Sequence, residues 1–179
     1  MAKSDDAVLS ISGLTVDFST PDGIIHAVRN IGFEVARGEC VGIVGESGSG
    51  KSQTVMAAMG LIAGNGTVSG EIRFQGENLV GMKPKQLNTI RGERIGMIFQ
   101  DPLTSLTPHM TIGAQMREVL RRHRGMSGKA AEARCVEWLE RVRIPEAARR
   151  LNQFPHELSG GMRQRVVIAM AMLCEPELL

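Results

Sequence analysis

Short apolar runs separated by glycine-containing turns make up the first half of the chain. Hydrophobic and polar side chains alternate over residues 8–18, 24–35 and 68–74, a pattern that predicts extended strands with one buried face. The apolar residues 41–44 and residues 94–99 are also expected to form strands, each leading into a polar loop. We therefore expect a strand-rich N-terminal half.

The second half shows helical spacing instead. Apolar residues recur at three- and four-residue intervals, which predicts helices at 112–122, 128–143, 145–151 and 159–174. Ser159 is suited to cap the last of them. Two shorter helices are expected in the first half, at 53–63 and 84–90. This order indicates a strand-rich core, an inserted helical lobe and a helix that returns to the core.

Composition describes an ordinary globular protein with an uneven charge distribution. A chain of 179 residues with 42% hydrophobic and 22% charged residues can form one domain, or one core with an inserted lobe. The net charge of +2 is too small to indicate nucleic-acid binding. Residues 115–150 nevertheless carry ten Lys or Arg against five acidic residues. Their densest patch, Arg121-Arg122-His123-Arg124, is either a solvated helix end or a surface for an anionic headgroup or partner.

The cysteines and the apolar runs bear on the cellular location. Cys40, Cys135 and Cys174 are widely spaced, which fits small buried side chains in a reducing compartment better than a disulfide framework or a zinc site. Residues 1–6 include two acidic residues and no apolar segment follows them, so no secretory signal is expected. The longest apolar runs, such as 166–174, have nine residues, about half of a bilayer span, so any membrane association would be peripheral.

A glycine-rich loop carries the clearest chemistry. Residues 45–52 read Gly-Glu-Ser-Gly-Ser-Gly-Lys-Ser, which matches G-x-x-x-x-G-K-[ST] between an expected strand and an expected helix. The glycines let backbone N–H groups converge on a phosphate at the positive end of the helix. Lys51 would reach the β- and γ-phosphates and Ser52 would bind Mg²⁺. The alternative is a flexible turn before a core helix. The candidate nucleotide-binding residues are Gly45, Glu46, Ser47, Gly48, Ser49, Gly50, Lys51, Ser52 and Gln53.

Two further segments are candidate functional motifs when they occur in the same chain as this loop. In Leu158-Ser159-Gly160-Gly161-Met162, a hydroxyl and two glycines open a helix, which gives either a second phosphate contact or an ordinary helix cap. Phe99-Gln100-Asp101-Pro102, taken without other information, is a strand end followed by a turn.

In this order, the three segments resemble the nucleotide-binding domains of ABC transporters. The resemblance implies an α/β fold of the P-loop NTPase (RecA-like) class, with a parallel-sheet core, an N-terminal antiparallel β-subdomain and an inserted helical subdomain. It divides the chain into residues 8–100 for the β-subdomain and core, 101–158 for the helical subdomain, and 159–179 for the signature helix and the start of the next strand. ATP and Mg²⁺ are the implied cofactors.

The resemblance also implies roles for single residues. Lys51 and Gln100 would serve catalysis, and Gln100 would bind Mg²⁺ together with Ser52 and contact the attacking water. Ser159, Gly160 and Gly161 would contact the γ-phosphate of ATP bound to a second ATP-binding subunit; Met162 replaces the glutamine that the family has next. Phe18 is the candidate for stacking on adenine, with packing inside the sheet as an equal alternative.

Details of the motifs narrow the resemblance to the dipeptide, oligopeptide and nickel importers of bacteria, in which a methionine after the two glycines is common. This subgroup implies an ATP-binding subunit that couples ATP hydrolysis to import. Its partners would be integral-membrane permease subunits, a second ATP-binding subunit and, indirectly, a periplasmic solute-binding protein, with no nucleic acid. It would lie peripherally on the cytoplasmic face of the inner membrane.

The resemblance further concerns the end of the chain. In the family, the strand that starts at the position of residues 178–179 ends in an Asp-Glu pair that acts on Mg²⁺ and water. We therefore expect an incomplete core, part of a longer protein, and poor nucleotide binding with negligible ATP turnover by the chain alone. The alternatives are a soluble ABC ATPase that transports nothing, and a truncated nucleotide-binding module without catalysis.

Overall fold

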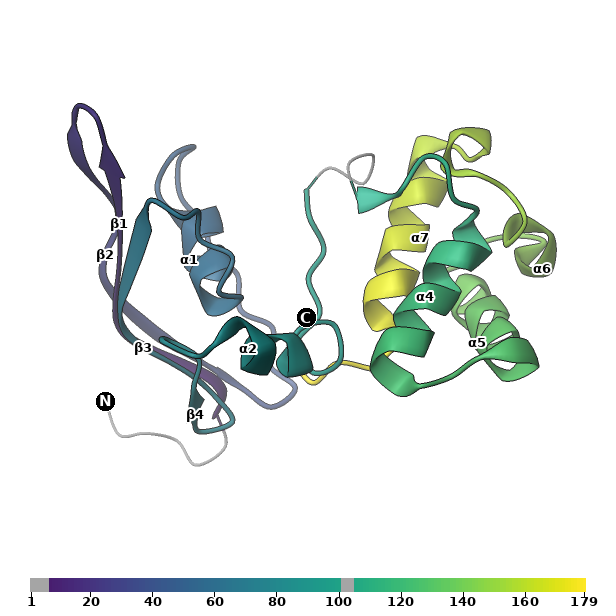
Figure 1. Ribbon diagram of the computed structural model, residues 1–179, viewed down its shortest axis with the longest axis horizontal. Helices are drawn as coiled ribbons and strands as arrows, with labels where there is room; N and C mark the ends of the chain where they lie inside the picture. Colours follow the sequence, from purple (N-terminus) through teal and green to yellow (C-terminus); the bar gives the residue numbers. More distant parts are fainter. Residues whose placement is uncertain (1–6, 101–104) are drawn as a thin grey trace. The chain divides into compact units, whose positions relative to one another are not determined.

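The computed structural model describes residues 7–100 and 105–179 and divides into two compact units, Met1–Asn88 and Thr89–Leu179 (Figure 1). The sequence places the first boundary at residue 100. In the structure, residues 89–100 belong with the helices instead. The reason is a backbone connection to the chain end: the Gly96 amide donates to the Leu178 carbonyl at 2.9 Å, and Ile95 forms a parallel bridge with Leu178.

The first unit is built on a four-stranded antiparallel sheet. The strands are β1 (Ala7–Thr20), β2 (Gly23–Ala36), β3 (Gly66–Phe74) and β4 (Glu77–Asn78), in the order β2-β1-β3-β4. Thr20 pairs with Gly23, so Pro21 and Asp22 form the hairpin turn. The strands expected at 8–18, 24–35 and 68–74, and with them the antiparallel β-subdomain, are confirmed.

One face of this sheet is closed by the helix that follows the glycine loop. Helix α1 (Lys51–Ala58) contacts β1 and β2 and buries Thr54, Ala57 and Ala58. The helix is shorter than the expected 53–63 because Gly60 adopts φ 59°, a left-handed conformation that ends a helix. Helix α2 (Pro84–Ile90) has the expected bounds. Leu14, Val16, Ile72 and Phe74 are completely buried in this unit.

The expected strands at 41–44 and 94–99 are wrong for the part of the chain that the structure describes. Residues 41–44 belong to no strand, and Val44 is 92% exposed. A parallel ladder needs at least one neighbouring parallel strand. Among the described residues, parallel pairing is limited to the isolated bridges of Ile95 with Arg91 and with Leu178. The parallel-sheet core expected from the sequence is therefore present only as these bridges.

The second unit is a helical bundle. It contains α4 (Ile112–Arg124), α5 (Gly128–Arg141), α6 (Ala147–Arg150), the 3₁₀ helix η1 (Pro155–Glu157) and α7 (Gly160–Met172). Helices α4, α5 and α7 contact one another, as Figure 1 shows. The four helices expected here are confirmed, with shifts at their ends. Their shared core includes Ile112, Met116, Leu120, Leu139, Val166 and Leu173.

Two of the three cysteines are buried in the helical unit. Cys135 and Cys174 are completely buried, and burial raises the pKa of the Cys135 thiol to about 11. Cys40 is exposed, contrary to the expectation, because it lies in the unpaired stretch that follows β2. All three are free thiols.

The basic patch forms the last turn of α4. Four basic side chains next to the carbonyl end of a helix are favoured by the helix dipole, and the Arg121 side chain is 72% exposed. Both interpretations of the patch, a solvated helix end or an anionic surface contact, stay predictions. Within residues 7–100 and 105–179, no helix has the length and apolar character needed to span a bilayer.

Candidate functional site: a phosphate-binding loop

The glycine loop closes around the ammonium group of its own lysine. Lys51 Nζ donates to the Gly45 carbonyl at 2.8 Å and to the Glu46 carbonyl at 2.7 Å. Ser49 Oγ lies 3.4 Å from the same ammonium, and the Ser49 amide donates to the Glu46 carbonyl at 3.2 Å. The loop is therefore a ring of backbone closed around a positive charge, and the three donors of the ammonium all meet oxygens of the loop. A bound phosphate would take over some of these hydrogen bonds.

Glycine is required where the loop bends most tightly. Gly50 caps α1 with φ 90°, and a Cβ at this position would lie 2.3 Å from the Ala27 carbonyl oxygen of β2. A Cβ on Gly45 would lie 2.7 Å from Ser49 Oγ. Gly48 also has a positive φ of 81°, but the space around it is open. The loop thus rests against β2 at one end and faces open space at its tip.

This difference allows a matched test. Gly50→Ala is expected to lower the free energy of unfolding by about 2–4 kcal/mol, because the left-handed backbone and the contact with β2 both penalise a Cβ. Gly48→Ala is penalised only by the left-handed backbone and should lower the free energy of unfolding by about 1 kcal/mol. Thermal unfolding followed by circular dichroism measures both. Equal losses for the two variants would contradict the packing of the loop against Ala27.

The start of α1 supplies the remaining candidate phosphate-binding groups. The first amides of a helix have no intrahelical acceptor and carry partial positive charge. Ser52 is exposed in the first turn and Gln53 is half-buried. Thr54, which sequence reasoning missed, is buried and anchors the loop, since its amide and its hydroxyl both donate to the Gly50 carbonyl, at 2.9 and 3.1 Å. The sequence signal for this anchoring role is a small polar residue four positions after the last glycine of the loop.

The residues present fit a magnesium nucleotide. Among the described residues, no group of three or more His, Cys, Asp or Glu could hold a metal ion by itself. Mg²⁺ is commonly held by only one or two protein ligands, with substrate phosphates and water completing its coordination. The exposed Ser52 hydroxyl beside the open loop is suited to be such a ligand.

Phe18, the candidate adenine platform, is half-buried on β1. It pairs with Ile25 of β2 and Gly66 of β3. Its Cε1 lies 2.8 Å from the position of a Cβ on Gly66, so one edge of the ring packs over that glycine. This contact is the one expected if Phe18 packs inside the sheet. Stacking of Phe18 on adenine stays a prediction.

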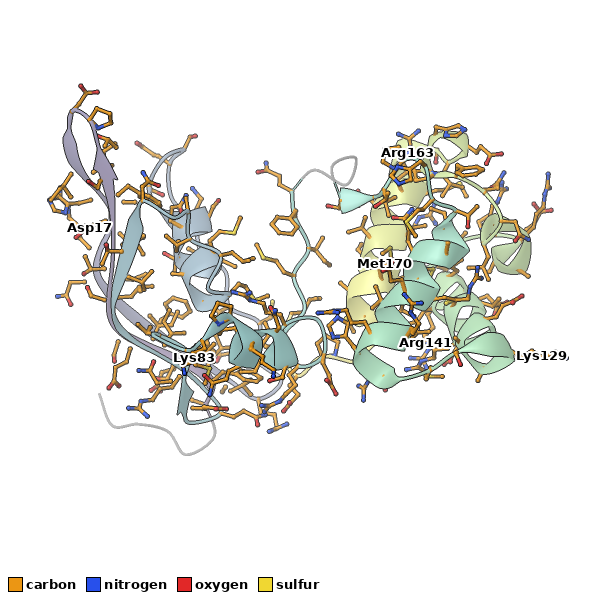
Figure 2. All side chains as sticks on the ribbon, in the orientation of Figure 1. Asp17, Lys83, Lys129, Arg141, Arg163 and Met170 are labelled. Atoms are coloured by element: carbon orange, nitrogen blue, oxygen red, sulfur yellow. The ribbon has the colours of Figure 1, made fainter. Side chains whose placement is uncertain are left out.

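The second motif lies at the start of α7, in the helical unit. Ser159 caps the helix, and its Oγ accepts a hydrogen bond from the Met162 amide at 3.3 Å. Gly160 and Gly161 are exposed, and a Cβ on either would meet nothing within 4 Å. Arg163, labelled at this end of α7 in Figure 2, fixes the preceding backbone because its Nε donates to the Leu158 carbonyl at 2.9 Å. The glycines therefore present an open backbone surface.

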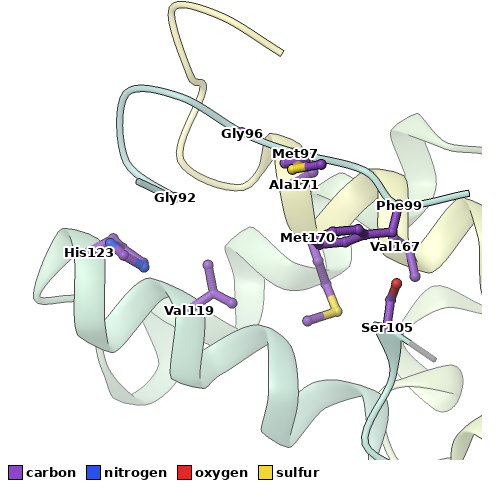
Figure 3. A pocket seen from close by; sticks show the side chains of 10 residues that line it. All are labelled: Gly92, Gly96, Met97, Phe99, Ser105, Val119, His123, Val167, Met170 and Ala171. Carbon is purple, nitrogen blue, oxygen red and sulfur yellow. The ribbon is translucent and has the colours of Figure 1, made fainter. Parts of the chain in front are cut away.

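Gln100 follows a segment that lines one cavity together with α7. The Gln100 side chain is exposed, and Asp101 and Pro102 of the same motif lie outside the described residues. Phe99 borders a cavity of about 560 Å³ together with Val167 and Met170 (Figure 3). The cavity contains none of the predicted site residues. His123 also lines it, and burial followed by the charge of Arg122 lowers the pKa of this imidazole, against an opposing effect of Glu93.

The structure thus gathers the predicted residues into separate groups. Gly45 to Gln53 form one continuous loop and helix start in the first unit, which also contains Phe18. Gln100 and Ser159-Gly160-Gly161 belong to the second unit.

The antiparallel sheet, the lysine-centred loop and the helical unit define an α/β nucleotide-binding domain of the P-loop class. A family model described as "ABC transporter" matches residues 28–179. The chain belongs to the ABC transporter family.

Named relatives agree with this assignment. "Oligopeptide transport ATP-binding protein OppD" of Salmonella typhimurium is 52% identical over 174 residues, covering 97% of this chain and 52% of that protein. The protein of the same name from Haemophilus influenzae is 54% identical over 172 residues, covering 96% of this chain and 53% of that protein. The chain spans about half the length of these curated relatives.

Solved structures confirm the fold class. "Dimeric Structure of MJ0796, a Bacterial ABC Transporter Cassette" superposes with a TM-score of 0.82 at 32% identity, covering 94% of this chain and 70% of that chain. A second dimeric structure of MJ0796, in "a post-hydrolysis state" and "bound to ADP and Pi", gives the same values. These likenesses confirm the cassette fold expected from the three motifs.

Proposed function

We propose that the chain is the nucleotide-binding part of an ATP-binding subunit of an ABC importer for peptides or related small solutes. The observation that carries the proposal is the closure of the glycine loop around the Lys51 ammonium, with the open first turn of α1 beside it. The names of the oligopeptide-transport relatives support the solute class.

Each candidate residue then has a physical role. Lys51 would neutralise charge on the β- and γ-phosphates, and the backbone amides of residues 45–53 would surround them. Ser52 and Gln100 would hold Mg²⁺, which polarises the γ-phosphate when bound. Gln100 would also orient the attacking water, and Phe18 would stack on adenine. The loop would act as a preorganised electrostatic site whose groups are already aimed at the phosphates.

Partners follow from the open signature segment. Ser159, Gly160 and Gly161 present exposed backbone at a helix start, which suits contact with the γ-phosphate of ATP on a second ATP-binding subunit. The dimeric MJ0796 structures support this arrangement by analogy. The two ATP-binding subunits would lie on the cytoplasmic face of the inner membrane and bind the permease subunits there. A periplasmic solute-binding protein would deliver the solute to the permease subunits.

Nucleotide competition tests the proposal directly. In calorimetric titrations of the assembled transporter, ATP and ADP should bind with Mg²⁺, whereas AMP should bind far more weakly because the loop recognises the phosphates beyond the first. Ser52→Ala should reduce the gain in affinity from Mg²⁺. Equal affinity for AMP and ATP would refute a phosphate-binding role of the loop.

A further inference from the structure

Ion pairs hold the residues that follow α7. Arg94 Nε, in the turn before residues 95–99, lies 2.7 Å from Glu177 Oε1. Arg134 Nη2, on α5, lies 2.9 Å from Glu175 Oε1. We call these two pairs the arginine clamp. They tie the exit of α7 both to the helical core and to the segment that leads to Gln100.

The clamp holds a backbone conformation that is unfavourable by itself. Glu175 has φ 48°, in the left-handed region that non-glycine residues rarely occupy. The hydrogen bond and charge of Arg134, with a smaller contribution from Arg141, lower the pKa of the Glu175 carboxyl. Both arginines also stack over the Trp138 ring, at 5.5 and 4.8 Å from its centroid. Arg134 therefore contacts both the α5 core and the turn after α7.

Backbone hydrogen bonds at the clamp define how residues 94–96 are aligned with residues 177–178. The Glu177 amide donates to the Arg94 carbonyl at 2.8 Å, and the Gly96 amide donates to the Leu178 carbonyl at 2.9 Å. On its other side Gly96 is tightly packed, since a Cβ there would lie 3.1 Å from the Ala171 carbonyl of α7. A shift by one residue would break both hydrogen bonds and place a side chain against α7.

Beyond the clamp, the segment follows α7. Met97 and Phe99 line the same cavity as Val167 and Met170 of that helix (Figure 3). Gln100 comes next, and the opposite end of α7 begins with the Ser159-Gly160-Gly161 segment. The segment that leads to Gln100 thus lies beside the same helix that begins with the second candidate element.

We propose that Arg94 and Glu177 are positioning residues, whose ion pair sets the register of residues 94–100 on α7 and thereby the place of Gln100 relative to Ser159-Gly160-Gly161. The roles of Gln100 and of the signature segment rest on the proposed function. Because consecutive Cα atoms lie about 3.8 Å apart, a slip of one residue would move Gln100 by about that distance relative to Ser159-Gly160-Gly161.

Hydrogen–deuterium exchange of the chain tests the register. Arg94→Gln and Glu177→Gln should each speed exchange at Gly96 about two- to fivefold, the range expected for loss of a partly exposed ion pair. The swap variant, Arg94→Glu with Glu177→Arg, should restore exchange to near the wild-type rate. Glu146→Gln is the matched control, because it removes ion pairs with Arg149 and Arg150 in the same unit and should leave exchange at Gly96 unchanged.

Turnover in the assembled transporter tests the consequence. Each single variant should lower kcat several-fold with at most a small rise in KM for ATP, because Gln100 is one of two residues proposed to hold Mg²⁺ and the phosphate loop lies in the other unit. The swap should recover kcat. Single variants that alter neither exchange nor kcat, or a swap that recovers neither, would overturn the proposal. A wild-type transporter without ATP hydrolysis would refute the proposed function, while the exchange data would still decide whether the clamp sets the register.

Discussion

Lys51→Ala is expected to abolish measurable ATP binding by the assembled transporter, with a loss of at least about 100-fold in affinity. Two charge-assisted hydrogen bonds to phosphate oxygens would disappear, each contributing about 1.5–3 kcal/mol. The ammonium also donates to the Gly45 and Glu46 carbonyls, at 2.8 and 2.7 Å, so the substitution removes the group around which the loop closes. Equilibrium binding by calorimetry measures the loss.

Lys85→Ala provides the control for this prediction. Lys85 is an exposed lysine on α2 in the same unit, so its removal changes the net charge equally without touching the loop. Affinity for ATP should stay within about twofold of wild type. If Lys51→Ala bound ATP as well as Lys85→Ala, the loop would not be the nucleotide site.

Ser159→Arg is expected to leave ATP binding intact and to lower kcat by about 10²–10³, the usual loss when one preorganised group of a transition-state site is removed. The substitution replaces a small cap by a long cation at the exposed start of α7, where a second subunit would bring its γ-phosphate. Binding and steady-state turnover must be measured on the same transporter preparation.

Ser127→Arg separates this effect from a general change at a helix start. Ser127 is the exposed N-cap of α5, and its side chain makes no capping hydrogen bond. Turnover should be unchanged in this variant. A loss of kcat shared by Ser127→Arg and Ser159→Arg, or a loss of ATP binding in Ser159→Arg, would contradict a role of the signature segment in trans.

The elements that the sequence predicts well are those whose signals are local. Alternation over residues 8–18 and 24–35, and helical spacing with the Ser159 cap, arise from neighbours along the chain, and β1, β2 and α7 follow these signals. The expected strands at 41–44 and 94–99 depend instead on distant partners. Their apolar residues are compatible with a parallel sheet, but composition cannot supply the neighbouring strands that a ladder needs.

The candidate site shows the same division. The phosphate loop is predictable because the spacing of its glycines, Lys51 and Ser52 is contained within eight consecutive residues. The contacts that hold the candidate site residues in place come from residues that are far away in sequence or that have no distinctive pattern. The contact of Gly50 with Ala27, the anchoring role of Thr54 and the pairing of Arg94 with Glu177 all depend on how separate segments meet.

The position of Trp138 determines which optical signals this molecule provides. It is the one tryptophan of the chain, which has no tyrosine, and it is buried on α5 beneath Arg134 and Arg141. Indole emission will therefore follow melting of the helical unit, whereas the phosphate-loop unit is almost silent at these wavelengths. A tryptophan introduced at Phe18 would give that unit its own reporter.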